Sequence, residues 1–368
     1  MTGLPGLGMV ILFGVCTAAC QTEKAACLTA ESETPPFRHE ITTSAKPWTD
    51  KSFDNAPNKF TFAVFGDLTG GERKRIFETA VAELNLLRPE LIMSVGDYIK
   101  GASRDPKVLN REWNDFDRRA NRSLAPIFYV GGNHDLGGAL LRDVWKQRRG
   151  PWYYHFVYRN VLFLVLDSED ISPERMREIR AAKEEAFARA NTSGSGAFDE
   201  PAHAKIPEWR YGAVGEAQAE YFIDAIADNP DVRWTFVFVH KPVWRTENEP
   251  HFSKIEAALS ARPYTVFHGH THLLDRELRR GRDYINISTT GASQFPRRGR
   301  STDHVTLVTV GETDVSIAHL LLGGILDKTG CIPLGGDTLQ FEKPLGGGGV
   351  GTMPWSPADF PNGYDDMK

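Results

Sequence analysis

Aspartates, histidines and one asparagine recur along this sequence in short motifs that contain glycine. In chain order these are GDLT at 66–69, GD at 96–97, GNHD at 132–135, an isolated His240 and GHTH at 269–272. Carboxylate oxygens, amide oxygens and imidazole nitrogens coordinate Mn, Fe and Zn in proteins. The motifs therefore indicate a metal site assembled from five separate segments.

Each motif taken alone also has a simpler explanation. Asp97 fits an ordinary turn, Asn133 fits a turn in which its side chain satisfies backbone groups, and His240 fits a buried core histidine. The GHTH motif is more specific, because His270 and His272 have the spacing of a pair of metal ligands on one turn. The order and combination of the motifs favour a shared site.

The elements that must position these motifs alternate between strands and helices. Apolar runs predict strands at 60–67, 90–97, 125–135, 161–170, 233–240, 264–272, 284–293 and 304–310. Helical spacing of apolar residues or a highly charged helical pattern predicts helices at 76–87, 106–122, 173–190 and 215–228. This alternation predicts an α/β fold, and ligands of such folds bind outside the carboxyl ends of the strands. The motifs should therefore converge.

The ordered series GDLT, GD, GNHD, H and GHTH resembles the calcineurin-like metallophosphoesterase family over residues 60–293. The resemblance implies an αββα sandwich of two mixed β-sheets flanked by helices, with two metals at the strand ends. It implies that the first metal position consists of Asp67, Asp97 and His272. It implies that the second consists of Asp97, Asn133, His240 and His270. In the same family pattern, His134 faces the substrate and is not a ligand.

This donor set suits phosphoester hydrolysis. Two divalent ions of Mn, Fe or Zn would carry more charge than Asp67 and Asp97 neutralise, which favours binding of a phosphoryl group. Two metals about 3.5–4 Å apart can share a hydroxide that serves as nucleophile. We expect His134 to assist the leaving group as a general acid, with Asp135 as its orienting partner.

One residue departs from the family pattern. Thr69 stands where the first motif of the family, Asp-x-His, has its histidine, and a neutral hydroxyl is the poorer ligand for these metals. Three interpretations are open. Thr69 contributes a weak ligand to the first metal position, another histidine such as His268 or His155 takes its place, or the first metal position is empty. We expect a weak first position, because Asp67 and His272 are retained.

Composition and motifs exclude other function classes. The formal net charge of −5 and the lack of a basic run argue against a nuclease or a nucleic-acid-binding surface. The polar run Ser288–Thr290 has no GxSxG context for a serine hydrolase. The acidic run Asp167–Asp170 is expected to be a solvated turn. The chain is thus predicted to be a metallophosphoesterase acting on a phosphoester substrate. The alternative is a degenerate, non-catalytic relative that binds a phosphate-containing ligand or a partner.

The amino-terminal residues predict export. Residues 9–19 form an apolar segment that is followed directly by Cys20. The sequence TAAC at 17–20 resembles a bacterial lipoprotein cleavage box. A lipidated Cys20 would attach the protein to a membrane in the cell envelope or periplasm. Simple signal cleavage and an uncleaved anchor are the alternatives.

The chain is expected to have one globular domain with extensions at both ends. The predicted parts are an export segment at 1–20, a flexible tether at 21–57, the metallophosphoesterase domain at 58–322 and a Gly/Pro-rich tail at 323–368. An oxidising compartment would permit a disulfide between Cys27 and Cys331.

Overall fold

The computed structural model describes most of the predicted domain. The described residues are 47, 56–193, 206–247, 249–295, 299–325, 327–329, 332 and 333. The export segment, nearly all of the predicted tether and most of the tail lie outside them, as do Cys27 and Cys331. Among the described residues, no helix is both long and apolar enough to span a membrane.

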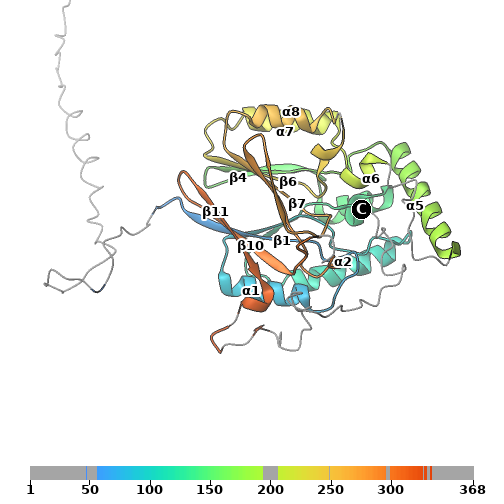
Figure 1. Cartoon of the computed structure of the whole chain (residues 1–368), viewed down its shortest axis with the longest axis horizontal. Helices are drawn as coiled ribbons and strands as arrows, with labels where there is room; N and C mark the ends of the chain where they lie inside the picture. Colours follow the sequence, from blue (N-terminus) through green and yellow to red (C-terminus); the bar gives the residue numbers. More distant parts are fainter. Residues whose placement is uncertain are drawn as a thin grey trace, which may run out of the picture. The chain divides into compact units, whose positions relative to one another are not determined.

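Two mixed β-sheets form the centre of the fold (Figure 1). The first has the order β11 (Val315–Leu321), β10 (His304–Val310), β1 (Phe60–Phe65), β2 (Leu91–Ser94) and β3 (Ile127–Phe128). The second has the order β4 (Tyr154–Tyr158), β5 (Val161–Val165), β6 (Trp234–Phe238), β7 (Tyr264–His268), β9 (Arg282–Asn286) and β8 (Asp275–Arg279). Strands β1, β2 and β3 are parallel, as are β5, β6, β7 and β9.

The two sheets pack face to face through aromatic side chains. The ring of Phe62 on β1 lies 5.4 Å from that of Phe163 on β5 and 4.9 Å from that of Phe236 on β6, centroid to centroid. All three side chains are completely buried. Burial of such rings is a major source of the free energy that stabilises a sandwich.

Helices cover the outer face of each sheet (Figure 1). Those on the first sheet are α1 (Ile76–Leu87), α2 (Pro106–Ala120), α3 (Asn133–Leu136) and α4 (Ala139–Arg149). Those on the second sheet are α7 (Glu216–Ala227) and α8 (Phe252–Leu259), with the short 3₁₀ turn η2 (Val243–Arg245). The 3₁₀ turn η3 (Leu322–Gly324) packs with the first group, and α5 (Pro173–Ser193) and α6 (Pro207–Tyr211) complete the helices of the described residues. The predicted αββα sandwich is therefore confirmed.

The third predicted strand is the main local difference. Only Ile127–Phe128 pairs as β3, and the chain then enters α3 at Asn133. Helix α3 begins there because the Asp135 carboxylate accepts a hydrogen bond of 2.9 Å from the amide of Gly132, which caps the helix. The GNHD motif thus lies on a helical turn rather than on the end of a strand.

Candidate metal centre

Three predicted ligands lie together at the carboxyl ends of β2, β6 and β7. Donor atoms of Asp97, His240 and His270 all lie within 4.8 Å of one another, and all three residues are buried. Asn133 joins them, because its Oδ1 lies 3.0 Å from Nε2 of His240. The second metal position predicted from the sequence is thus assembled at one place in the fold.

The ring of His240 is oriented by the backbone. Its Nδ1 lies 2.7 Å from the carbonyl oxygen of Val95, which can only accept, so Nδ1 carries a hydrogen. Nε2 faces the other donors and lies 3.2 Å from Oδ2 of Asp97. This arrangement is typical of metal-binding histidines, in which a carbonyl or carboxylate partner fixes the ring.

Burial and neighbouring charges shift the pKa values of the three side chains. Burial opposes protonation of His240, but Asp97 and then Asp67 outweigh it and raise the pKa of His240 to about 9. Burial likewise opposes ionisation of Asp97, but His240 and His134 lower its pKa below the usual range. Burial and the nearby Lys241 hold the pKa of His270 well below its usual value. The centre therefore favours a compensating positive charge beside Asp97.

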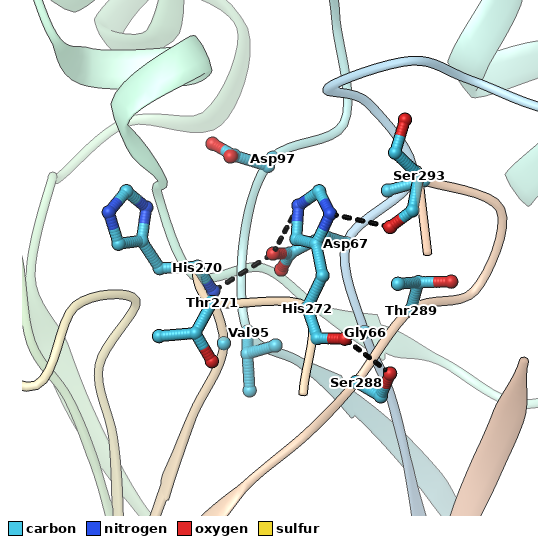
Figure 2. Close-up of polar contacts among 12 residues, drawn as sticks. Gly66, Asp67, Val95, Asp97, His270, Thr271, His272, Ser288, Thr289 and Ser293 are labelled. Carbon is cyan, nitrogen blue, oxygen red and sulfur yellow. Dashed lines mark hydrogen bonds and ion pairs between the residues drawn. The ribbon is translucent and has the colours of Figure 1, made fainter. Parts of the chain in front are cut away.

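Asp67 and His272, predicted for the first position, lie together beside this cluster (Figure 2). Oδ2 of Asp67 accepts a hydrogen bond of 2.9 Å from the amide of His270 and lies 3.3 Å from Nε2 of His272. The Nδ1 of His272 is 2.8 Å from the carbonyl oxygen of Ser293, so its Nε2 also faces inward. Burial raises the pKa of Asp67, and its two histidine neighbours oppose that rise.

A divalent cation fits these residues. Oδ1 of Asp67 is buried and has no hydrogen-bond partner among the described residues. An unsatisfied buried carboxylate oxygen is costly unless a cation or another donor compensates it. Together with the inward-facing Nε2 atoms, this oxygen supplies the donor chemistry that Mn, Fe or Zn requires.

The backbone at three of the predicted ligands adopts a left-handed conformation that residues other than glycine rarely adopt. The φ angles are 60° at Asp97, 71° at His270 and 57° at His272. Left-handed conformations of this kind cost on the order of 1–3 kcal/mol each and concentrate at functional sites. Close approach adds a second constraint, because a Cβ at Gly132 would lie 2.2 Å from Oδ1 of Asp97.

Thr69 lies next to Asp97 but brings no imidazole. Its side chain is buried and its amide donates a 3.2 Å hydrogen bond to the carbonyl oxygen of Asp97. His268 packs instead against Trp244, with the ring centroids 5.0 Å apart. Nδ1 of His155 lies 2.8 Å from the Tyr221 hydroxyl on α7, on the outer face of the second sheet. Replacement of the missing ligand by either histidine is therefore not supported.

His134 lies at the edge of the centre. Its amide donates a 2.9 Å hydrogen bond to Oδ1 of Asp97, and its Nε2 lies 3.9 Å from Oδ2 of Asp97. Its Nδ1 lies 2.8 Å from the carbonyl oxygen of Lys100. Nδ1 therefore carries a hydrogen, and Nε2 is the ring nitrogen that faces Asp97.

Asp135 contacts the backbone rather than the His134 ring. Its carboxylate accepts from the amides of Asp97 at 2.7 Å, Tyr98 at 3.1 Å and Gly132 at 2.9 Å. Burial and the Asp97 carboxylate raise the pKa of Asp135 to about 8, while the amides favour its ionised form. The expected orienting contact is thus made by Lys100, and Asp135 ties the GD segment to the GNHD segment.

A buried ion-pair network borders the centre where a solvated turn was expected. Nζ of Lys241 lies 2.8 Å from Glu169, and Arg142 lies 2.7 Å from Asp167. Burial raises the pKa of Asp167 to about 6, with Arg142 opposing it. The expectation fails because Arg142 and Lys241 are remote in sequence and neutralise both carboxylates only in the fold.

Comparison with known proteins identifies the family. The model of the calcineurin-like phosphoesterase family matches residues 60–274, which include every motif described above. No curated protein matches the chain. A dimetal phosphatase from Danio rerio is 15% identical with a TM-score of 0.47, covering 71% of this chain and 99% of that protein. A purple acid phosphatase from yellow lupin (Lupinus luteus) is 12% identical with a TM-score of 0.47, covering 71% of this chain and 51% of that protein. Because the family model matches more than half of the sequence, the chain belongs to the calcineurin-like phosphoesterase family.

Proposed function

We propose that this protein is a metal-dependent phosphoester hydrolase. The observation that carries the proposal is the convergence of Asp97, His240 and His270 with Asn133 at one buried centre. Membership of the family supports phosphoester hydrolysis in general.

The inward-facing donors would hold two divalent cations. Asp97, Asn133, His240 and His270 would hold the second, and Asp67, Asp97 and His272 the first. Bound there, the cations would supply Lewis-acid chemistry and lower the pKa of water towards neutrality. The strained and buried backbone around Asp97 and His272 keeps these side chains in a fixed geometry before substrate binds.

His134 would hold the proton for the leaving group. Because Nδ1 already donates to the Lys100 carbonyl, a proton for the substrate must reside on Nε2. Oδ2 of Asp97 lies 3.9 Å from that nitrogen. A general acid of this kind contributes on the order of 10²–10⁴ in rate.

The two positions should differ in affinity. The second would have two imidazoles, an amide oxygen and Asp97, whereas the first would have Asp67, Asp97 and His272, with Thr69 and its hydroxyl where the family pattern has a histidine. The hydroxyl is neutral and a weaker donor for borderline metals than imidazole. We therefore expect two unequal binding steps, with the first position filled at the higher metal concentration.

Metal analysis combined with an assay tests this proposal. Metal-free protein is titrated with Mn²⁺ and assayed against p-nitrophenyl phosphate and bis(p-nitrophenyl) phosphate, with Asp97→Asn as the test variant. Asp275→Asn, on the exposed strand β8, is the matched control. We expect Mn²⁺-dependent hydrolysis that Asp97→Asn abolishes and Asp275→Asn retains. Binding of fewer than one ion per chain, with no cleavage of either ester, would contradict it.

A non-catalytic relative is the second candidate. Thr69, in place of a ligand histidine, is the observation that favours it. Such a protein would bind Mn²⁺ and inorganic phosphate at the same centre, and Asp97→Asn would abolish that binding although no ester is cleaved.

Export and membrane attachment remain proposals from residues 1–20 alone. Labelling of cells with radioactive palmitate tests them, since a lipoprotein should incorporate label at Cys20 and Cys20→Ser should not. Label in neither protein, with a free mature amino terminus, would favour simple cleavage.

A further inference from the structure

The segment 289–295, here called the 289–295 loop, packs around the His272 ring. The Ser293 carbonyl accepts from Nδ1 of His272, and the Phe295 ring stacks on the imidazole with the centroids 5.5 Å apart (Figure 2 shows the Ser293 contact). On another side of the imidazole, a Cβ at Gly70 would lie 3.0 Å from Cε1 of His272. The orientation of His272 therefore depends on where this loop sits.

Arg73 fastens the loop from the segment that follows Thr69. Its amide donates to the Gly291 carbonyl at 2.7 Å, and its guanidinium donates to the Ala292 carbonyl at 2.8 and 3.1 Å. The same guanidinium pairs with both oxygens of Asp303, at 2.7 and 2.5 Å. Paired donors in this fork geometry give the strongest and most directional ion-pair contacts.

Asp303 completes the connection on the far side. Its side chain is 3% exposed. Its carboxylate also accepts hydrogen bonds from the Thr289 hydroxyl at 2.8 Å and from the side-chain amide of Gln294 at 2.9 Å. The loop is thereby fixed on both sides of Ser293. The amide of Ser293 also donates to the Gly70 carbonyl at 3.3 Å, which links the loop directly to the turn after Thr69.

We propose that Arg73 is a positioning residue for the first metal position, acting through the 289–295 loop and the Ser293 carbonyl on His272. The inference rests on the proposed function, since it presumes that His272 is a ligand. The hydrogen bonds described for Arg73 go to Asp303 and the loop, and none of them reaches a residue assigned to the second position. Where a histidine ligand is missing, the remaining imidazole must be held more exactly, because the first position has few other donors.

Loss of charge and loss of positioning at Arg73 should change the cation affinity in opposite directions. Arg73→Gln removes a positive charge and leaves Asp303 without its counter-charge. Through Coulomb interaction alone, this loss of one positive charge would strengthen cation binding. Loss of positioning would weaken it, because removing a residue that orients a ligand typically lowers metal affinity by about 10–100-fold.

Calorimetric titration of the metal-free, full-length protein with Mn²⁺ tests the proposal. The variants are Arg73→Gln and the milder Arg73→Lys. The matched control is Arg119→Gln, which removes an equal charge from an ion pair with Glu72, the residue next to Arg73. Circular dichroism of each metal-free protein establishes that it is folded.

The wild type should bind two ions. Arg73→Gln should lower the Mn²⁺ affinity of the weaker binding step by about 10-fold or more and leave the affinity of the stronger step within about 2-fold of the wild type. Arg73→Lys should show an intermediate loss at the weaker step. Arg119→Gln should leave the affinities of both steps unchanged. Unchanged or tighter binding at the weaker step would overturn the proposal, as would equal weakening of both steps. If Arg73→Gln fails to fold, Arg73→Lys decides by the same criteria. A wild type that binds no Mn²⁺ would refute the proposed function itself, which is a distinguishable outcome.

Discussion

Nδ1 of His240 lies 2.7 Å from the carbonyl oxygen of Val95, two residues before Asp97 on the same segment. The strand end that carries one predicted ligand thus orients another, which comes from the opposite sheet. His272 and His134 are oriented in the same way, each by a backbone carbonyl at 2.8 Å. In all three rings a backbone carbonyl thus faces Nδ1, which leaves Nε2 towards the centre.

Restoring the family histidine should strengthen the first position. Thr69→His adds an imidazole beside Asp67 and His272, and an added ligand worth about 1.4 kcal/mol tightens binding about 10-fold. Calorimetry with Mn²⁺ should show the weaker step becoming stronger while the other step stays constant. Thr69→Val, which removes the hydroxyl without adding a donor, should show no such gain. If Thr69→His and Thr69→Val bind Mn²⁺ equally, residue 69 does not face the metal.

Removing the proposed general acid should separate chemistry from metal binding. His134→Ala should lower kcat by about 10²–10⁴-fold, because the leaving group loses its proton donor. Metal content by mass spectrometry should stay near that of the wild type. His155→Gln, which changes a histidine bonded to Tyr221 outside the centre, should leave kcat unaltered. Loss of metal in His134→Ala would show instead that His134 is a ligand.

The Lys241–Glu169 pair should behave as a buried ion pair. Both side chains are less than a tenth exposed, at 4% and 8%. Lys241→Met leaves Glu169 without its partner, and breaking such a pair typically costs about 3–5 kcal/mol of unfolding free energy. The double variant Lys241→Met/Glu169→Gln should lose clearly less than the sum of the single losses in urea unfolding. Additive losses would mean that the two residues are not coupled.

Glu83 should make the protein less stable as pH rises. Its carboxylate is buried on α1 and has no hydrogen-bond partner among the described residues. Burial raises its pKa from 4.5 to about 9, so the folded state retains a proton that the unfolded state releases. The cost therefore develops between pH 4.5 and 9, at no more than about 1.4 kcal/mol per pH unit.

Glu83→Gln removes that titration. Urea unfolding at pH 5 and pH 8 should show a variant that gains stability over the wild type at pH 8 more than at pH 5. The exposed Glu220→Gln on α7 is the control and should leave the pH profile unaltered. Parallel profiles for Glu83→Gln and the wild type would refute the account.

Four of the five motifs follow a buried strand whose apolar run is visible locally, and GNHD, on the helical turn α3, is the exception. Asp67 and Asp97 follow the parallel strands β1 and β2 of one sheet, and His240 follows β6 of the other, at the carboxyl end of each strand as expected for an α/β fold. Strand β8 (Asp275–Arg279) has no such signal. Its residues are mostly polar and exposed, and it forms through pairing with β9 alone.

Contacts between remote residues could not be predicted from the sequence. Arg73 and Asp303 are 230 positions apart, and neither lies in a motif. The buried pairs of Arg142 and Lys241 likewise depend on tertiary packing rather than on local pattern. The Asp135 interaction was predicted for the wrong partner, because sequence proximity suggested His134 while the fold presents the amides of Asp97 and Tyr98.

Anomalous diffraction from crystals soaked in Mn²⁺ tests the central claim most directly. The account predicts a strong anomalous peak about 2.0–2.3 Å from Nε2 of His240 and within coordinating distance of Asp97 and His270, and a weaker peak beside Asp67 and His272. The absence of any peak at Asp97, at Mn²⁺ concentrations that support hydrolysis, would contradict it.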